Sequence, residues 1–117
     1  YLPPADSGIS IREPSLHMQI GTSASLRTEL TGSFYLGALS YTNDSTAKDT
    51  WRFFKPGDWN TIRLQARGPV FTVSVNGQVV HKYADDKHPD AGPISLQVHD
   101  RFDMKIEFKN IRIAEMN

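Results

Sequence analysis

The sequence predicts an all-β protein, and within that class a two-sheet antiparallel sandwich of the jelly-roll kind. Apolar and polar residues alternate with a period of two in several short segments, which is the pattern of half-buried strands. Turn residues such as Gly68-Pro69 separate these segments at short intervals. No helix of useful length is required anywhere. About eight short strands with frequent turns favour a sandwich over a barrel.

An antiparallel meander is predicted between residues 59 and 81. Trp59 opens a strand and is expected to pack in the core, and residues 62–67 alternate between apolar and polar side chains. Residues 71–75 alternate again as a second strand. Asn76-Gly77 supplies the positive-φ pair that a type I′ hairpin turn requires, so the chain is expected to return as a third strand.

Upstream of the meander, the same patterns predict two strands, a loop, a third strand and a second loop. The first strand is expected at 8–12, with Ile9 and Ile11 inward and Ser10 and Arg12 on the opposite face. The second is expected at 16–20, with His17 and Gln19 outward. A loop at 21–29, a strand with a glycine-marked bend at 32–39 and a loop at 41–50 follow.

Downstream of the meander, two more strands are expected. Residues 92–99 alternate with Ile94, Leu96 and Val98 inward and Gln97 and His99 outward. Residues 104–113 close the domain as a final strand, with Ile106 and Phe108 inward. The apolar parity changes after Asn110, which predicts a bulge at that position.

Composition bounds the function without defining it. The 117 residues allow one domain with a modest core, and Lys plus Arg equal Asp plus Glu at 13 each. There is no basic excess for a phosphate backbone, so nucleic acid is not an expected partner. Cysteine is absent, so neither a disulfide framework nor a thiolate metal site is expected. No apolar run approaches the length of about 18 residues that a transmembrane helix needs.

Six blocks of the sequence, in order, resemble the 3-keto-disaccharide hydrolase domain family. They are Ser7-Gly8-Ile9-Ser10-Ile11-Arg12, His17-Met18-Gln19-Ile20, Gly57-Asp58-Trp59-Asn60, the strand ending in Asn76-Gly77, Gly92-Pro93-Ile94-Ser95-Leu96-Gln97-Val98-His99 and Glu107-Phe108-Lys109-Asn110-Ile111-Arg112-Ile113. The resemblance implies a concanavalin A-like lectin/glucanase jelly roll of secreted or periplasmic bacterial carbohydrate metabolism. Family members usually have further strands before the first block. Residues 1–117 are therefore expected to be a single lectin-like sandwich domain, the C-terminal part of a larger family domain, and incomplete within this chain.

A saccharide site is expected on the polar side of one sheet. Sugars are bound by amides and guanidinium groups that pair with adjacent hydroxyls, and by an aromatic ring that covers the apolar face of a pyranose. Candidate binding residues are Arg12, His17, Gln19, Gln97 and Trp51, with Tyr35, Tyr41 and Phe54 as further candidates for the ring. The alternative is a solvated outer face with ordinary ion pairs, such as one between Arg12 and Glu13 or Glu107.

Three residues carry the expected chemistry. His99 is a candidate general base or metal ligand, and the alternative is a strand-end histidine bonded to a loop. Glu107 is the one strand carboxylate in a family block and the second catalytic candidate. His17 stands where the family commonly has Glu, which removes a carboxylate that could act as acid, base or metal ligand. The identity of any metal is left open, with a divalent ion as the expected kind.

The resemblance implies cleavage of a 3-keto sugar, in which the ketone acidifies a neighbouring C–H bond and one base is sufficient. A hydrolase- or lyase-like enzyme is thus the leading hypothesis. One alternative is a non-catalytic carbohydrate-binding module, favoured by His17. Another is a structural subunit of a cell-surface or fibrous assembly, with a partner chain or a second copy completing the sandwich by strand exchange. The expected location is secreted, periplasmic or at the cell surface.

Overall fold

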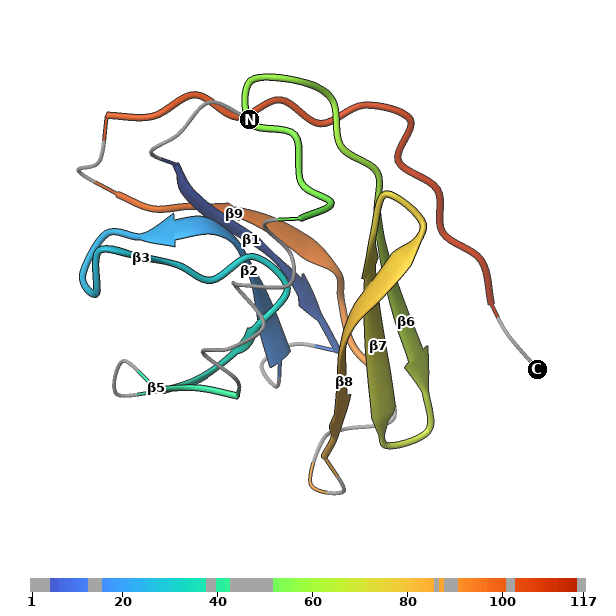
Figure 1. Cartoon of the computed structure of the whole chain (residues 1–117). Helices are drawn as coiled ribbons and strands as arrows, with labels where there is room; N and C mark the ends of the chain where they lie inside the picture. The colour runs from blue at the N-terminus through green and yellow to red at the C-terminus, as the bar shows by residue number, and fades with distance from the viewer. Residues whose placement is uncertain are drawn as a thin grey trace.

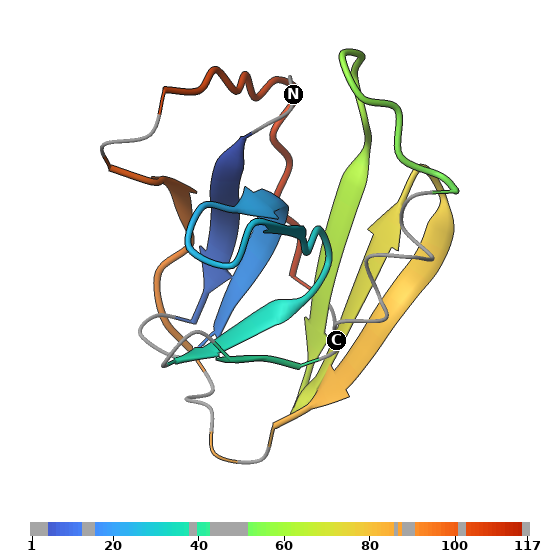
Figure 2. The same cartoon turned by 60° about the vertical axis from the view of Figure 1, so that its left-hand side comes forward.

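A computed structural model describes residues 5–12, 16–37, 40–42, 52–85, 87, 91–100 and 103–115. These residues form two antiparallel sheets and no helix, which confirms the predicted all-β sandwich. Figures 1 and 2 show the two sheets from directions 60° apart. Over the same residues, no helix is long and apolar enough to cross a membrane.

The larger sheet has six strands and the smaller sheet has three. The strands are β1 (Asp6–Ile11), β2 (Leu16–Ser23), β3 (Thr28–Glu29), β4 (Phe34–Gly37), β5 (Ser40–Tyr41), β6 (Ile62–Arg67), β7 (Val70–Val75), β8 (Gln78–Ala84) and β9 (Ser95–Val98). The larger sheet has the strand order β5-β4-β2-β1-β9, with β3 paired to β2, and the smaller sheet has the order β6-β7-β8.

The core lies between the sheets and is built from alternate residues of the central strands. Met18, Phe34, Phe71 and Val73 are each 0% exposed. The rings of Phe34 and Phe71 meet edge to face with centroids 5.9 Å apart, so the two sheets contact each other directly through aromatic side chains. Ile9 and the other apolar residues of β1 pack against this cluster, as the alternation predicts.

The meander forms as the sequence predicts. β6, β7 and β8 pair in sequence order, and Gly68-Pro69 makes the first turn. Asn76 and Gly77 have φ values of 50° and 85°, which is the left-handed conformation that a type I′ turn requires. The bend predicted within 32–39 is also present, because the register of β4 on β5 shifts between Tyr35 and Gly37.

The loops predicted at 21–29 and 41–50 are wrong in part. β2 continues to Ser23 because Gly21 still pairs with Asp6 of β1. Thr28 and Glu29 then return as β3. Tyr41 pairs with Tyr35 and belongs to β5. Short polar segments can extend a sheet when a neighbouring strand offers free backbone groups, and local polarity does not reveal this.

The prediction that Trp59 packs in the core is also wrong. β6 begins at Ile62, and Trp59 belongs to the turn before it, where 46% of its surface is exposed. The Lys109 ammonium lies 3.9 Å from the centroid of the Trp59 ring. A cation over the face of an exposed indole is attracted to the ring even when the ring is not buried. Trp59 therefore contacts Lys109, near the end of the chain, instead of filling the core.

Residues 104–113 do not form the predicted final strand. They belong to a segment, residues 103–115, that is assigned to neither sheet. The predicted alternation is nevertheless present, because Ile106 and Phe108 pack against the core while Lys105 and Glu107 are exposed. The predicted break in parity is present too, since Asn110 has a φ of 53°. The side-chain pattern is therefore readable from the sequence, but it does not reveal whether a neighbouring strand is available for pairing.

The apolar side of β9 is not buried, contrary to the prediction for Ile94, Leu96 and Val98. Their exposed fractions are 45%, 43% and 61%. Leu96 pairs with Ile9, and therefore does lie on the core side of the larger sheet. Among the described residues the smaller sheet consists of β6, β7 and β8, and Leu96 and Val98 remain exposed on the core side of the larger sheet.

The buried imidazole of His81 gives the fold a predicted dependence on pH. Its Nε2 lies 2.7 Å from Thr42 Oγ1 and its ring packs against Phe34. Burial lowers the pKa of His81 below its ordinary value of 6.5. The unfolded chain then binds this proton more readily than the folded chain, so stability is full above pH 6.5 and is lost as the pH falls below it.

The measurement is urea unfolding of the wild type and His81→Gln at pH 7.5 and 5.5. The loss of unfolding free energy between these pH values should be smaller in the variant, because position 81 no longer titrates. Equal losses in both proteins would show that the other histidines account for the dependence.

Candidate functional site

The side of the larger sheet that faces away from the core gathers most of the polar candidates. We define this polar face by the residues that the pairing places on it: Asp6, Gly8, Ser10, His17, Gln19, Tyr35, Tyr41, Gln97 and His99. Ser10, His17 and Tyr35 form one row across β1, β2 and β4. Gln97, Gly8 and Gln19 form the next row, across β9, β1 and β2.

This face has a buried floor and a half-buried rim. Asp6, Ser10 and Gln19 are 5%, 8% and 1% exposed and make the floor. His17, Tyr35, Tyr41, Gln97 and His99 are half-buried and make the rim. Rim residues can contact a ligand directly, whereas floor residues can only orient the rim.

His17 lies at the centre of the rim. Its imidazole occupies the space above Gly8, because a Cβ on Gly8 would lie 2.2 Å from His17 Cε1. His17 Nδ1 is 3.4 Å from Ser10 Oγ, and its Nε2 is 3.4 Å from Gln19 Oε1. The ring also meets Tyr35 edge to face at 6.4 Å between centroids. Glycine at position 8 is therefore what allows an aromatic ring to lie flat on this part of the sheet.

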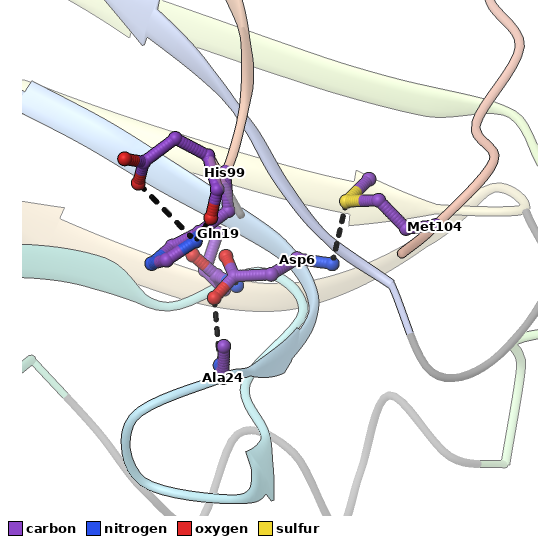
Figure 3. Close-up of polar contacts among 6 residues, drawn as sticks. Asp6, Gln19, Ala24, His99 and Met104 are labelled. Carbon is purple, nitrogen blue, oxygen red and sulfur yellow. Dashed lines mark hydrogen bonds and ion pairs between the residues drawn. The ribbon is translucent and has the colours of Figure 1, made fainter. Parts of the chain in front are cut away.

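The floor fixes the orientation of the Gln19 amide. Gln19 Nε2 donates to Asp6 Oδ1 at 2.8 Å, and the other Asp6 oxygen accepts from Ala24 N at 2.7 Å. Figure 3 shows Asp6 with its partners Gln19, Ala24 and Met104. Since an ionised carboxylate only accepts, the Gln19 oxygen must point toward His17. This arrangement favours the tautomer of His17 that carries its proton on Nε2.

Two tyrosines form the other side of the rim. The rings of Tyr35 and Tyr41 have centroids 5.3 Å apart and an interplanar angle of 56°. Burial raises the pKa of Tyr41, a side-chain hydrogen bond with Ser23 opposes this, and the negative charge of Asp6 and the Tyr35 hydroxyl add to the increase. The Tyr41 hydroxyl therefore stays protonated at neutral pH and can donate a hydrogen bond.

Gln97 and His99 enter the rim from β9. Gln97 Oε1 is buried and has no hydrogen-bond partner among the described residues. The backbone of His99 continues the pairing of β9 with β1, because His99 N donates to Asp6 O at 3.2 Å. His99 Nδ1 lies 2.6 Å from the carbonyl oxygen of Asp100. A carbonyl oxygen can only accept, so Nδ1 carries a proton and Nε2 is the basic nitrogen of neutral His99.

Arg12 lies apart from this face, which corrects the side predicted for it. Its φ of 52° turns the chain at the end of β1, and its guanidinium lies against the smaller sheet. Arg12 Nη1 donates to Gly68 O at 2.8 Å, and the guanidinium carbon is 5.5 Å from the centroid of the Phe71 ring. These contacts join the two sheets. Within the described ranges no ion pair joins Arg12 to Glu107, and Glu13 lies outside those ranges.

We expect Arg12→Ala to lower stability without changing ligand affinity. Loss of one hydrogen bond to a charged donor and one cation–π contact should reduce the free energy of unfolding by about 1–2 kcal/mol. Urea unfolding measures this, and Arg63→Ala on the exposed side of β6 is the control, with little expected change. A weakened ligand affinity in folded Arg12→Ala would contradict a purely structural role.

A further candidate, Glu107, does not join the polar face. Glu107 lies on the exposed side of residues 103–115, where its carboxylate is 3.3 Å from Lys105 Nζ. No hydrogen bond or ion pair connects it with a residue of the polar face in the described part of the chain. Trp51 lies outside the described residues. The structure thus brings together four of the seven candidates, namely His17, Gln19, Gln97 and His99.

Comparison with known proteins assigns the chain to a family. The family model described as the 3-keto-alpha-glucoside-1,2-lyase-like domain matches residues 1–114. The chain belongs to this family. No curated protein and no solved structure matches the chain. This lyase-like domain is therefore carbohydrate-related by family, and the residues of its polar face can be considered for that chemistry.

A metal site is not formed by the part of this lyase-like domain that the structure describes. No group of three or more His, Asp or Glu side chains lies close enough there to hold an ion. Asp6 already accepts two hydrogen bonds, and Glu107 pairs with Lys105.

Sequence reasoning missed Asp6 as a member of the site. The sequence predicts that the first strand starts at Gly8, which leaves Asp6 in the proline-containing entry of the chain. Asp6 is in fact the first residue of β1. The alternation of side chains could have revealed it. Asp6 is two residues before Gly8 and four before Ser10, so a strand that begins at Asp6 places all three residues on the same face.

Proposed function

We propose that this domain binds a saccharide across the rim of the polar face and eliminates the aglycone of a 3-keto-glycoside, with His99 as the base. The family's description supports a 3-keto-glucoside substrate. The observation that carries the proposal is that strand pairing places two imidazoles (His17 and His99), the Gln97 amide and two tyrosines on one face of the larger sheet.

The rim supplies the groups that a sugar requires. Tyr35 and Tyr41 offer ring surfaces for the apolar face of a pyranose, and Gln97 offers an acceptor that has no partner among the described residues. His17 is held by Ser10 and Gln19, so its orientation is fixed before a ligand arrives. Such preorganisation lowers the entropy that is lost on binding.

The chemical step needs one base and one donor. His99 Nε2 removes the proton from the carbon next to the ketone, the C–H electron pair forms a new C=C bond, and the glycosidic oxygen leaves with its bonding pair and takes up a proton. Imidazole is the commonest general base in proteins. Negative charge develops on the ketone oxygen during proton removal. The protonated hydroxyl of Tyr41 is a donor of this face that can stabilise it.

The direct test is incubation of the protein with a 3-keto disaccharide, followed by mass spectrometry of the products. We expect an unsaturated keto sugar and the released second sugar. His99→Ala should lower the rate at least about 100-fold, the range of a lost general base, while retaining affinity in isothermal titration calorimetry. Lys82→Ala, an exposed change on β8, is the control and should match the wild type.

A second candidate function is saccharide binding without turnover. The positions of two carboxylates favour this function. Asp6 accepts hydrogen bonds from Gln19 and Ala24, and Glu107 lies away from the polar face and pairs with Lys105. It predicts calorimetric binding of the 3-keto disaccharide and no product. In that case His17→Ala should weaken binding, and neither the wild type nor His99→Ala should release product. Absence of both binding and product would refute both functions.

We also propose a secreted, periplasmic or cell-surface location as the setting of this activity, as the resemblance of the sequence blocks implies. Fractionation of the native source with antibodies against the chain tests it. Recovery in the secreted, periplasmic or surface fraction is expected, and recovery in the cytosol alone would contradict it.

A further inference from the structure

The C-terminal segment, residues 103–115, has the side-chain pattern of a strand but no strand partner among the described residues. No backbone–backbone hydrogen bond joins it to the rest of the part of the chain that the structure describes, and the backbone N–H of Asp6 donates to the Met104 sulfur at 3.3 Å. Figure 1 shows it as the red trace that runs beyond β6. Backbone groups in such a segment are an open template for pairing with another chain. Such pairing does not depend on the function proposed for the polar face, which the segment contacts through Met104 and Asp6.

One side of the segment is anchored and the other is exposed. Met104, Ile106 and Phe108 are half-buried, and Ile106 and Phe108 pack against the core. Lys105 and Glu107 are exposed, with 72% and 57% of their side-chain surfaces accessible. Beyond Asn110, the side chains of Ile111 and Ile113 are 64% and 73% exposed. The segment is therefore held by its apolar side while its two backbone edges face no strand within the described ranges.

Two copies of residues 103–109 can be paired antiparallel so that Ile106 of one copy lies opposite Ile106 of the other. In this register complementary side chains lie opposite each other along the whole segment. We propose that a second copy of this chain pairs with the segment in this register and forms a two-fold symmetric dimer. In this register Ile106 faces its own copy and Met104 faces Phe108, while charged residues face opposite charges. The charged pairs are Lys105 with Glu107 and Asp103 with Lys109, each occurring twice. The Lys109 ammonium lies over the Trp59 ring in the single chain and turns toward Asp103 of the second copy to complete the outer pair.

Neighbouring registers lack this match. The register centred on Lys105 also places Met104 opposite Ile106, and the register centred on Glu107 places Ile106 opposite Phe108 but Met104 opposite Asn110. The first places Lys105 opposite Lys105 and Asp103 opposite Glu107. The second places Glu107 opposite Glu107 and Lys105 opposite Lys109. Like charges opposite each other destabilise a strand pair and opposite charges stabilise it, so the register centred on Ile106 is selected. In this register a two-fold axis passes between the two copies of Ile106, and each copy uses the same surface, as in an isologous dimer.

The test is sedimentation velocity of the full chain over a series of protein concentrations, with a charge-swap set. Lys105→Glu places a glutamate opposite Glu107 twice in each dimer, and Glu107→Lys places a lysine opposite Lys105 twice. Each should raise the dimer dissociation constant about tenfold or more. The double variant K105E/E107K restores opposite charges and should dimerise like the wild type. Both sites are exposed, so the fold should be unaffected.

Mixing the two single variants gives the sharpest result. In the mixed dimer, the two glutamates of the K105E copy would face the two lysines of the E107K copy, so heterodimers should form where each variant alone does not. Lys82→Glu, on the exposed edge of β8, is the matched control and should dimerise normally. A wild type that is monomeric at all concentrations overturns the proposal. So does a dimer that responds equally to Lys82→Glu, or a mixture that shows no preference for heterodimers.

Discussion

Phe34→Ala is expected to remove most of the protein's free energy of unfolding. Phe34 is 0% exposed and its ring contacts Phe71, His81 and Tyr83, with centroids 5.8–5.9 Å away. Truncating a fully buried Phe costs about 3–5 kcal/mol. A small domain has a total stability near the lower end of about 5–15 kcal/mol. Circular dichroism and urea unfolding measure the loss.

Leu36→Ala on the same strand is the matched control. Leu36 is 49% exposed, so its truncation should cost less than about 1 kcal/mol. If both variants lost similar stability, β4 would contribute through its backbone pairing, and the aromatic contact between the sheets would not be the main support of the fold.

Gly8→Ala should have the second largest effect, on both stability and ligand binding. The new Cβ would lie 2.2 Å from His17 Cε1 and 2.7 Å from the Met18 carbonyl oxygen. The imidazole can rotate away, but the carbonyl belongs to the paired strand β2 and cannot. We expect a loss of about 1–3 kcal/mol in unfolding free energy, as for other overpacked sites. Affinity for the 3-keto disaccharide should fall because His17 leaves its position.

The double variant G8A/H17A separates the two contributions. Removing the imidazole relieves the contact with the ring, so the double variant should lose less stability than the sum of the two single changes. Additive losses would mean that the Met18 carbonyl alone opposes a side chain at position 8. Thermal unfolding of all four proteins completes this double-mutant cycle.

Much of the fold is readable from the sequence because alternation and turn chemistry act locally. The turn at Asn76-Gly77 and the inward parity of β2 depend only on neighbouring residues, and both are confirmed. Two other features depend on how far a neighbouring sheet extends. One is the exposure of Val98, and the other is that residues 103–115 have no strand partner within the described ranges. That extent is a property of the whole assembly of strands, and a period of two carries no information about it.

The site is readable to the extent that strand parity fixes a side chain's direction. Alternation predicts His17 and Gln97 on one face, and they lie there. The prediction for Arg12 is wrong because its positive φ turns the side chain away from the strand's regular alternation. The floor could not be predicted either, since a local pattern cannot show that Asp6 meets Gln19 and Ala24.

The pairing of β1 with β9 has a consequence for the order of folding. The Ser7 hydroxyl donates to the Gln97 carbonyl across 90 positions of the sequence, whereas β6, β7 and β8 are joined by short turns. Loop-closure entropy makes long-range pairing slow, so the meander should form early and β9 should dock last. Gln97 and His99 both arrive with β9. The candidate site therefore exists only once nearly the whole chain has folded, and partly folded molecules should be inactive even when most of their strands are in place.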